Sequence, residues 1–434
     1  MIYSSEYETM LRADLEQLQV ERLQVTLNRV YRNVLFYKNL YDEKQIEILN
    51  IKSLKDLSSL PFTTKKDLRE SYPYEAFAVP LRDIVRIHST SGTTGTPIVV
   101  GYTKNDLKIW STLVARVLSA AGITGTDLVQ IAFNYSQSTG GLGFHYGAEQ
   151  IGASVIPASG EEVLKQIKIM KDYRSSAIVS TPGYALHIVS ILEDQGMDPQ
   201  ELNLSTGIFG SEPWSEKLRT EIETRLKIQA FDNYGLSEII GPGVAFECDK
   251  HKGLHVNEDH FIVEVIDPET LEVLPEGSEG ELVFTTITKE GFPLIRYRTG
   301  DISSIITGLC GCGRTTRRIS RVSGRTDDMI IVDGNNLFPA QIEALLFEIE
   351  GVEPHFQIIL NREEGLDVIE LKVEVSSSVF AFDEIRKVQS FQEKIHQQLI
   401  TSLGLHAKIT LIEPKSLGRT RGEKIKRVMD LRTL

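Results

Sequence analysis

Residues 88–97 gather side chains that could bind phosphate. They read His-Ser-Thr-Ser-Gly-Thr-Thr-Gly-Thr-Pro and lie between the apolar segments 84–87 and 98–100, which predict strands. Glycines let backbone N–H groups turn towards an anion, and hydroxyl groups add further donors. A Walker phosphate loop is excluded, because no lysine follows either glycine at the required spacing. A solvated hairpin turn is the alternative that this composition alone favours.

Two further polar segments directly follow apolar strand segments. One reads Gly-Ser-Glu-Pro at residues 210–213, and the other reads Asp-Asn-Tyr-Gly-Leu-Ser-Glu at residues 232–238. We expect each to be a strand end, a turn and a helix start, and such strand ends border one ligand crevice in open α/β sheets. Tyr234 could stack on a purine, and Glu238 could hold Mg²⁺ bound to phosphate. For Glu238 alone, a charge that favours a helix N-terminus is the simpler interpretation.

Charged residues nearer the C-terminus could complete a nucleotide site. We expect Asp301 just after a strand, where its carboxylate could accept hydrogen bonds from both ribose hydroxyls. The basic run at residues 418–427 contains Lys424 and Lys426. A lysine on such a loop could stabilise the charge that develops during attack on an α-phosphate. A solvated turn and a solvated basic run are the default interpretations of these segments in isolation.

A glycine-dense segment at residues 139–149 could let a ligand approach the backbone closely. Packing of a helix against a sheet explains the glycines equally well. Tyr135, just before this segment, could line a pocket for a flat aromatic acid. We expect Gly140, Gly141 and Gly210 to border the same pocket.

The three cysteines of the chain fall in two segments some sixty residues apart, and the first of these segments also carries histidines. Cys248 precedes His251 and His255, and Cys310 and Cys312 follow. Three thiolates and one imidazole make a closed tetrahedral site for structural Zn²⁺. The spacings are not those of a classical zinc finger, and buried cysteines without a ligand are the alternative. Either histidine could be the fourth ligand.

Length and composition narrow the class of protein. The 434 residues predict two or three folding units at about 150 residues each. The formal net charge of −13 argues against a nucleic acid partner. The first residues lack the layout of a signal peptide and no apolar run is long enough to span a bilayer, so we expect a cytoplasmic protein without a membrane partner. A homodimer is the default oligomer, because symmetric pairs are the commonest assemblies.

The elements that must position these residues alternate between strand and helix. Expected strands lie at 128–132, 154–157, 177–180 and 206–209, and expected helices at 104–122, 141 onwards, 161–172 and 183–195. This alternation predicts βαβ units with a parallel sheet. Residues 5–45 predict two packed helices, and residues 261–306 predict an antiparallel, partly barrel-like subdomain.

A domain boundary is expected at the polar segment 323–328. Beyond it the pattern restarts with a strand at 329–332, a helix at 339–349 and two more strands, which predicts a small α+β domain of a common size. We therefore expect domains at 1–324 and 325–434.

The order of these motifs resembles that of the adenylate-forming enzymes, which activate carboxylic acids with ATP. The matching segments are 89–97, 210–213, 232–238, 297–301, 324–328 and Lys424. Within that superfamily, segments 139–149, 258–261 and 335–343 are similar to the phenylacetate–CoA ligase family. The resemblance runs from about residue 20 to the end. It implies an α/β fold with a large N-terminal domain of layered βαβ sheets plus a β-rich subdomain, and a small mobile α+β C-terminal domain.

The resemblance also implies roles for the matching residues. Those assigned to the nucleotide are Ser89, Thr90, Ser91, Gly92, Thr93, Thr94, Ser211, Glu212, Pro213, Asp232, Asn233, Tyr234, Gly235, Ser237, Asp301 and Arg325. Among them, the loop at 89–96 holds the phosphates, Tyr234 packs on the adenine, and Asp301 and Arg325 hold the ribose. Ser237 and Glu238 serve phosphate and Mg²⁺.

Three further implied assignments lie outside the nucleotide set. Asp327 is the hinge about which the small domain swings between two half-reactions, and Lys424 drives adenylation. The last loop reads Gly422-Glu423-Lys424 where the family has Glu-Gly-Lys, which keeps Lys426 open as the alternative. Some relatives carry a zinc site, and they favour His255 over His251 as its fourth ligand.

The implied activity is that of an acid–CoA ligase that uses ATP, Mg²⁺ and coenzyme A on an aryl acid such as phenylacetate. A second hypothesis keeps the adenylation step but passes the acyl or adenylyl group to an amine, a carrier protein or a flavin-type cofactor. A third is a nucleotide-binding scaffold without turnover. The joint presence of Glu238, Asp301 and Lys424 argues against the scaffold.

Overall fold

The computed structural model divides into two compact units, Met1–Arg321 and Val322–Leu434. The structure describes residues 1–90, 96–135, 139–160, 162–326, 330–332, 335–337, 339–363, 366–380, 385–414, 416–417 and 428–432. The first unit ends three residues before the boundary that the sequence suggested at 324. Each unit has its own hydrophobic core, as expected for separate domains.

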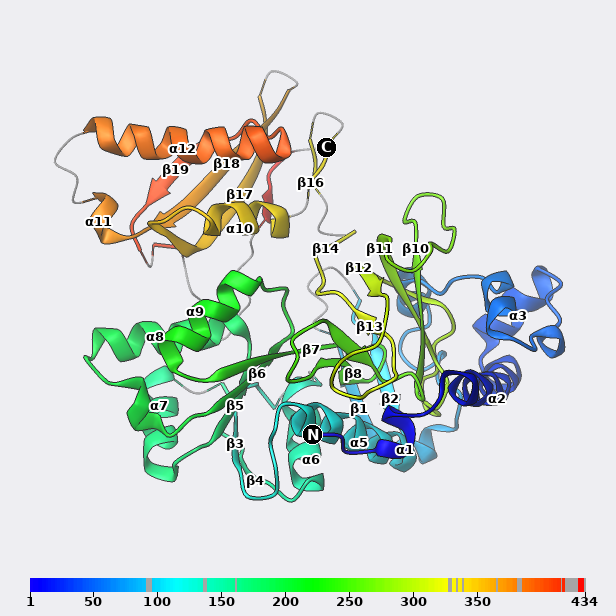
Figure 1. The fold of residues 1–434 in the computed structure, drawn as a ribbon. Helices are drawn as coiled ribbons and strands as arrows, with labels where there is room; N and C mark the ends of the chain where they lie inside the picture. Colours follow the sequence, from blue (N-terminus) through cyan, green and yellow to red (C-terminus); the bar gives the residue numbers. More distant parts are fainter. Residues whose placement is uncertain are drawn as a thin grey trace. The chain divides into compact units, whose positions relative to one another are not determined.

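The first unit is built on a large sheet whose parallel half has the order β4–β3–β5–β6–β7 (Figure 1). Its strands are β3 (Leu128–Ile131), β4 (Ser154–Ile156), β5 (Ala177–Ser180), β6 (Thr206–Gly210) and β7 (Gln229–Leu236). The crossovers between them are α6 (Gly140–Gln150), α7 (Val163–Tyr173), α8 (Pro182–Asp194) and α9 (Glu216–Leu226). The predicted βαβ alternation is confirmed.

Two hydrophobic cores lie on opposite faces of this sheet. On β5, Ile178 packs with residues of α7, α8 and α9, whereas the next residue, Val179, packs with α5 (Lys104–Ala120) and α6. Successive strand residues point to opposite faces, so a strand covered by helices on both sides must be apolar throughout. This explains the short, uniformly apolar runs in the sequence.

The sheet becomes antiparallel beyond β7, in the order β7–β8–β9–β13–β12–β11–β10. These strands are β8 (Gly241–Glu247), β9 (Leu254–Val256), β10 (Phe261–Ile266), β11 (Glu279–Thr286), β12 (Tyr297–Ile306) and β13 (Arg318–Ile319). The antiparallel pattern expected over 261–306 is confirmed. The expected barrel-like closure is not found in the described residues, because these strands extend the large sheet as one open path.

Several further elements complete the first unit. They are α1 (Ser5–Glu8), α2 (Arg12–Asn33), α3 (Leu35–Glu43), α4 (Lys65–Glu70), β1 (Arg86–Ser89), β2 (Val99–Tyr102) and the 3-10 turns at Ile48–Asn50, Leu54–Ser59, Leu81–Asp83 and Pro199–Leu202. The packed N-terminal helices α2 and α3 match the expectation for residues 5–45. Thr64 caps α4, and its hydroxyl accepts a hydrogen bond from the Asp67 N–H.

The second unit is a small α+β domain. A four-stranded sheet has the order β19–β18–β17–β20 and is covered by helices. Its elements are β14 (Gly324–Arg325), β15 (Ile330–Val332), β16 (Asn335–Leu337), α10 (Pro339–Phe347), β17 (Val352–Glu363), β18 (Leu366–Val375), α11 (Ser377–Phe380), α12 (Ile385–Leu403), β19 (Lys408–Ile412) and β20 (Val428–Asp430). Ile358, Leu371 and Ile395 form the centre of its core. Within the described parts of the chain, no helix is long and apolar enough to cross a bilayer.

A buried ion pair fastens α5 to the segment that precedes β10. The Arg116 guanidinium donates two hydrogen bonds to the two carboxylate oxygens of Asp259, at 2.8 and 2.9 Å, and both side chains are almost fully buried. Burial opposes ionisation of Asp259, but His260 and Arg116 hold its pKa well below the ordinary value. The charge on Asp259 therefore contributes to the stability of the first unit.

We predict that Arg116→Met lowers the free energy of unfolding by about 3–5 kcal/mol, because it leaves a buried carboxylate without its cation. The folded-state pKa of Asp259 is depressed, so its contribution is complete above about pH 4 and disappears as the pH falls further. Denaturant unfolding at several pH values checks both effects. Lys168→Met, which breaks an exposed ion pair with Asp172, is the matched control and should leave the free energy of unfolding unchanged. Equal stability of Arg116→Met and the parent protein would contradict the assignment.

Candidate active site

Strands β1 and β2 flank the predicted phosphate loop. They pair antiparallel with Ser89 opposite Val99, and Thr90 closes the pair through two contacts with Ile98: its N–H donates to the Ile98 carbonyl and its hydroxyl accepts from the Ile98 N–H, both at 3.0 Å. The expected strand pair around a polar loop is confirmed. Ser91, Gly92, Thr93 and Thr94 lie outside the described residues.

The polar turn after β6 and the end of β7 meet at one edge of the sheet. Gly210 pairs with Asn233 in the parallel register, and a Cβ at Gly210 would collide with the Asn233 carbonyl oxygen. Ser211 has a left-handed backbone with φ of 70°, which turns the chain away from the strand. Glu212 then accepts a hydrogen bond from the Gly183 N–H at 2.9 Å, at the start of α8. These contacts fix the first side of the predicted crevice.

Tyr234 and Asp301 come from β7 and β12 and meet through a hydrogen bond. The tyrosine hydroxyl donates to the Asp301 carboxylate at 2.7 Å, and its ring stacks on Phe284 with centroids 5.9 Å apart. Asp301 is buried and lies within β12, not after a strand as the sequence suggested, because the strand continues to Ile306. The pair brings together two residues that are 67 positions apart.

The segment after Tyr234 differs from its prediction. We expected a helix to begin near Glu238, but the chain makes a tight turn and enters β8 at Gly241. A Cβ at Gly235 would collide with the Gly241 carbonyl oxygen, so the two sides of the turn approach closely. Ser237 lies 3.1 Å from the Thr139 hydroxyl, oxygen to oxygen. Glu238 is buried, and its carboxylate accepts a hydrogen bond from the Tyr297 hydroxyl at 3.4 Å.

Asn233 holds the backbone of the site, and the side chain of Asp232 lies 3.6 Å from Arg321. The Asn233 side-chain oxygen accepts from the Gly243 N–H at 3.0 Å, which ties β7 to β8. Asp232 is buried beside Glu247, and burial together with that second carboxylate raises its pKa to about 7. Both residues were predicted to bind nucleotide. In the structure the Asn233 side chain bonds to the Gly243 backbone, and the Asp232 side chain lies beside Glu247.

A chain of three polar side chains begins at Tyr135, which was predicted to line the acid pocket. The Tyr135 hydroxyl lies 3.2 Å from Nδ1 of His145, and Nε2 of His145 lies 3.2 Å from the Glu149 carboxylate. Burial raises the pKa of Tyr135 well above its ordinary value, so the phenol stays protonated at neutral pH. Sequence reasoning missed His145, although its spacing of four residues from Glu149 in a helix places both side chains on one face.

Gly140 and Gly141 begin α6, where the helix passes close to the preceding loop. A Cβ at Gly141 would lie 2.9 Å from the Asn134 carbonyl oxygen. The rings of Phe133 and Phe144 stack nearby with centroids 6.2 Å apart. The glycines thus permit close packing of α6, which is one of the two explanations that the sequence left open.

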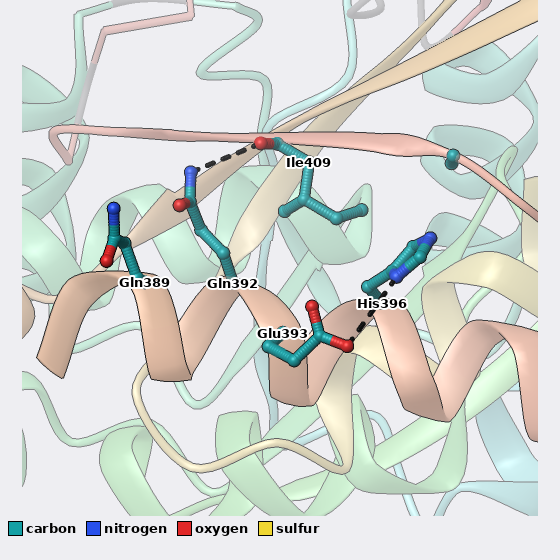
Figure 2. A pocket seen from close by; sticks show the side chains of 6 residues that line it. Gln389, Gln392, Glu393, His396 and Ile409 are labelled. Atoms are coloured by element: carbon teal, nitrogen blue, oxygen red, sulfur yellow. Dashed lines mark hydrogen bonds and ion pairs between the residues drawn. The ribbon is translucent and has the colours of Figure 1, made fainter. Parts of the chain in front are cut away.

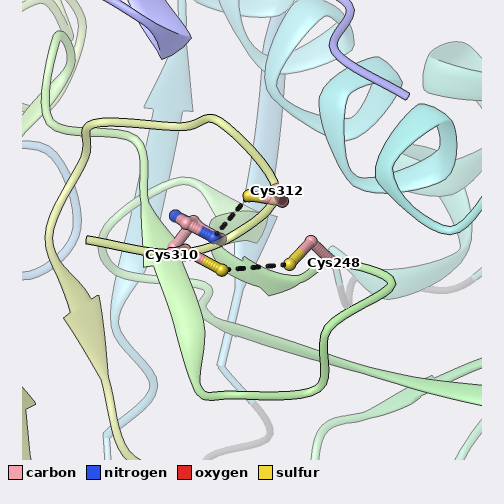
Figure 3. Close-up of side chains that lie close together, drawn as sticks. Cys248, Cys310 and Cys312 are labelled. Carbon is pink, nitrogen blue, oxygen red and sulfur yellow. Dashed lines mark hydrogen bonds between the residues drawn. The ribbon is translucent and has the colours of Figure 1, made fainter. Parts of the chain in front are cut away.

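A separate cluster in the first unit could hold a metal ion (Figure 3). One ligand atom from each of Cys248, His255, Cys310 and Cys312 lies within 4.8 Å of all the others. The Cys248 and Cys310 sulfurs are 3.7 Å apart, and the Cys312 sulfur is 3.3 Å from Nε2 of His255. His251 lies outside this group and contacts Arg219 and Glu247.

Three further predicted residues belong to the second unit, whose described residues also form a groove. Arg325 is in β14, whereas Asp327 and Lys424 lie outside the described residues. An open groove of about 350 Å³ lies between α12 and β19 (Figure 2). It is lined by Gln389, Gln392, Glu393, His396, Ala407 and Ile409, none of which the sequence singled out.

Comparison with known proteins identifies relatives over the whole length. The family described as AMP-binding enzyme matches residues 15–288, and the AMP-binding enzyme C-terminal domain matches residues 334–432. The chain is 44% identical to a phenylacetate–coenzyme A ligase of Thermus thermophilus, with 100% of both chains covered. It is 43% identical to that of Escherichia coli, covering 98% of this chain and 97% of the relative. A crystal structure of 2-hydroxyisobutyryl-CoA ligase with 2-HIB-AMP superposes with a TM-score of 0.91 at 28% identity, covering 98% of this chain and 91% of that one.

Proposed function

The chain belongs to the phenylacetate–coenzyme A ligase family of AMP-binding enzymes, and we propose that it joins an aryl carboxylic acid to coenzyme A. Its reaction class is that of the AMP-forming acid–coenzyme A ligases, which work through an acyl adenylate. The observation that best supports a nucleotide site in this chain is the contact between Tyr234 and Asp301 beside the turn that carries Glu238.

The nucleotide would lie against the carboxyl ends of β6 and β7. Tyr234 offers an aromatic face for the adenine, and the Asp301 carboxylate, held in place by the Tyr234 hydroxyl, would accept from the ribose hydroxyls. Ser211 and Glu212 would border the base, and the loop that begins at Ser89 would take the phosphates. From the sequence alone, the proposal also includes Arg325.

Glu238 fits a role in holding Mg²⁺ with the triphosphate. Hard oxygen donors suit this cation, and the turn carries the buried carboxylate of Glu238 next in sequence to Ser237. When bound, the ion would supply positive charge to the β- and γ-phosphate oxygens. The contact with the Tyr297 hydroxyl would orient the carboxylate towards it.

Two half-reactions account for the overall conversion. A carboxylate oxygen of the acid attacks the α-phosphorus, the bond to the bridging oxygen breaks, and pyrophosphate leaves with the electron pair. The sulfur of coenzyme A then attacks the acyl carbon, its proton passes to solvent, and AMP leaves. Lys424 would stabilise the charge that builds up in the first step. Asp327 would be the hinge that lets the second unit serve both steps in turn.

The acid is proposed to be aryl, with phenylacetate as the first choice. The half-buried ring of Phe133, which stacks on the buried Phe144, and the protonated phenol of Tyr135 would provide a flat apolar surface with a polar group, which suits an aromatic acid. His145 and Glu149 would keep the Tyr135 hydroxyl in one orientation.

The direct test is acid-dependent release of AMP and pyrophosphate from Mg-ATP, measured across aryl and short alkyl acids with and without coenzyme A. We expect thioester formation with an aryl acid. Lys424→Ala should lower the rate of adenylation by roughly 10²–10³-fold, as expected for the loss of a group that stabilises transition-state charge. Lys426→Ala is the control and should stay close to the parent rate.

Each other outcome of this assay points to a different function. Pyrophosphate exchange without thioester would indicate an amine, a carrier protein or a flavin-type cofactor as the acceptor. Absence of both across all acids would favour the nucleotide-binding scaffold. A larger loss in Lys426→Ala than in Lys424→Ala would move the adenylation role to Lys426.

The ribose assignment makes a separate prediction for Asp301. We expect Asp301→Asn to raise KM for ATP about tenfold or more, because a hydrogen bond to a charged group contributes about 1.5–3 kcal/mol. Tyr234→Phe keeps the aromatic face and removes only the hydroxyl that orients Asp301, so its KM for ATP should rise less. Steady-state kinetics with the acid saturating give both values. A KM for ATP that stays unchanged in Asp301→Asn would overturn the assignment.

We further propose that the cluster of Cys248, His255, Cys310 and Cys312 holds a structural Zn²⁺. The donor set of three sulfurs and one imidazole suits zinc in a closed site. The Thr316 hydroxyl lies 3.2 Å from Nδ1 of His255, which would fix the ring so that Nε2 faces the sulfurs. The ion would join the loop of Cys310 and Cys312 to the end of β8, without a part in the chemistry.

Metal analysis of the purified protein tests this zinc site. We expect about one zinc per chain, loss of the ion in Cys248→Ser and His255→Gln, and retention in the control His251→Gln. Chelation should lower the unfolding temperature of the parent protein, because binding to the folded state alone stabilises it. Full zinc content in His255→Gln, with loss in His251→Gln, would assign the fourth ligand to His251 instead.

A further inference from the structure

A lysine is buried directly beneath the turn that carries Glu238. Lys289 follows β11, and its side chain is only 2% exposed. Its ammonium donates to the carbonyl oxygens of Glu238 at 3.1 Å and Ile239 at 2.6 Å. It also lies over the rings of Tyr102 and Phe292, at 4.8 and 5.2 Å from their centroids. All of these partners belong to the first unit.

Burial of this ammonium group is unfavourable by itself. Burial lowers the pKa of Lys289 to about 7, although Asp106 and Glu238 favour its charged form. An apolar side chain of similar size would fill the same space without that penalty. It would leave two buried carbonyl groups without a donor, however, and such groups are costly. A lysine at this position is therefore favoured over an apolar residue because it donates to these two backbone carbonyl groups.

The same turn is held by two more side chains. The Tyr102 hydroxyl donates to the Ile240 carbonyl, and the Trp110 indole N–H donates to the Pro242 carbonyl, both at 3.0 Å. The rings of Tyr102 and Trp110 stack on each other with centroids 5.2 Å apart. With Lys289, these residues bind the carbonyl groups of residues 238, 239, 240 and 242. Side chains from distant segments thus determine the path of the turn.

The backbone next to Lys289 is fixed as well. The Asp106 carboxylate accepts from the N–H groups of Glu290 at 2.7 Å and Gly291 at 2.9 Å. Asp106 is itself fully buried at the start of α5, where it also accepts from the Thr103 N–H at 2.9 Å. Lys289 therefore connects the loop at 289–291 with the turn that carries Glu238. Without its ammonium group, the backbone of Glu238 would lose a hydrogen bond that fixes its position.

We propose that Lys289 is a positioning residue for Glu238, which it holds at the depth and orientation needed to bind the metal–triphosphate group. The inference rests on the proposed role of Glu238 in the ligase reaction. Lys289 does not touch the nucleotide, so its effect passes only through the turn. Loss of Lys289 should therefore weaken the binding of MgATP far more than the binding of AMP, because AMP has neither the β- and γ-phosphates nor the bound cation.

The test is calorimetric binding of MgATP and AMP without acid, together with the KM for MgATP during turnover. In Lys289→Met we expect the Kd and KM for MgATP to rise about tenfold and the Kd for AMP to change less than twofold. In the Glu238→Gln background, Lys289→Met should add little, because residues that act through one another are not additive. Lys168→Met, on the exposed face of α7, is the control for a surface lysine.

Folding is monitored in parallel through the unfolding temperature. If Lys289→Met does not fold, Lys289→Gln takes its place; because it keeps an N–H donor, we expect a smaller rise in the Kd for MgATP, again with the Kd for AMP changed less than twofold. The inference is overturned if the affinities for MgATP, AMP and acid all fall by one factor that follows the unfolding temperature, since that pattern marks a purely structural residue. It is also overturned if the effects of Lys289→Met and Glu238→Gln add fully.

The two proposals can fail separately in this design. If the parent protein binds MgATP but forms no adenylate, the proposed ligase function is refuted. The comparison of MgATP and AMP binding then still tests the positioning role of Lys289. A parent protein that forms thioester, with unchanged MgATP affinity in Lys289→Met, refutes the role of Lys289 alone.

Discussion

The candidate site depends on the close approach of Gly235 and Gly241, where β7 turns back into β8. A side chain at Gly235 would collide with the Gly241 carbonyl oxygen, so the reversal requires a glycine. At this point the sheet changes from parallel to antiparallel pairing. The change lets residues from β6, β7 and β12 reach one place, because the antiparallel strands bring Asp301 back to the end of β7.

A turn of this kind has few hydrogen bonds of its own, so other parts of the chain must supply them. Regular strands satisfy their carbonyl groups in pairs, whereas the carbonyls of residues 238, 239, 240 and 242 receive donors from Lys289, Tyr102 and Trp110. Each of these contacts joins segments at least fifty residues apart. The position of Glu238 is therefore a property of the folded unit and not of its local sequence.

This difference explains which features the sequence could predict. The helices and strands between residues 104 and 210 follow from local apolar patterns, and the strands around the phosphate loop follow in the same way. The expected helix start at Glu238 was wrong, because the donors that shape its turn are distant and leave no local signal. Asp301 was expected just after a strand, yet the Tyr234 hydroxyl donates to its carboxylate and lets it lie inside β12. His145 was missed because a single histidine in a helix carries little information until its partners are known.

The end of the first unit constrains how the second unit can move if it serves two half-reactions. Arg321, the last residue of the first unit, donates to the Trp214 carbonyl at 3.0 Å, pairs with Glu216 at 3.1 Å and lies over the Trp214 ring. These contacts fix the chain where the unit ends. Each unit also has its own core, so neither core depends on the other unit. The contacts of Arg321 support the proposal that the hinge lies beyond it, at Asp327, and they would make Arg321 the fixed end of that hinge.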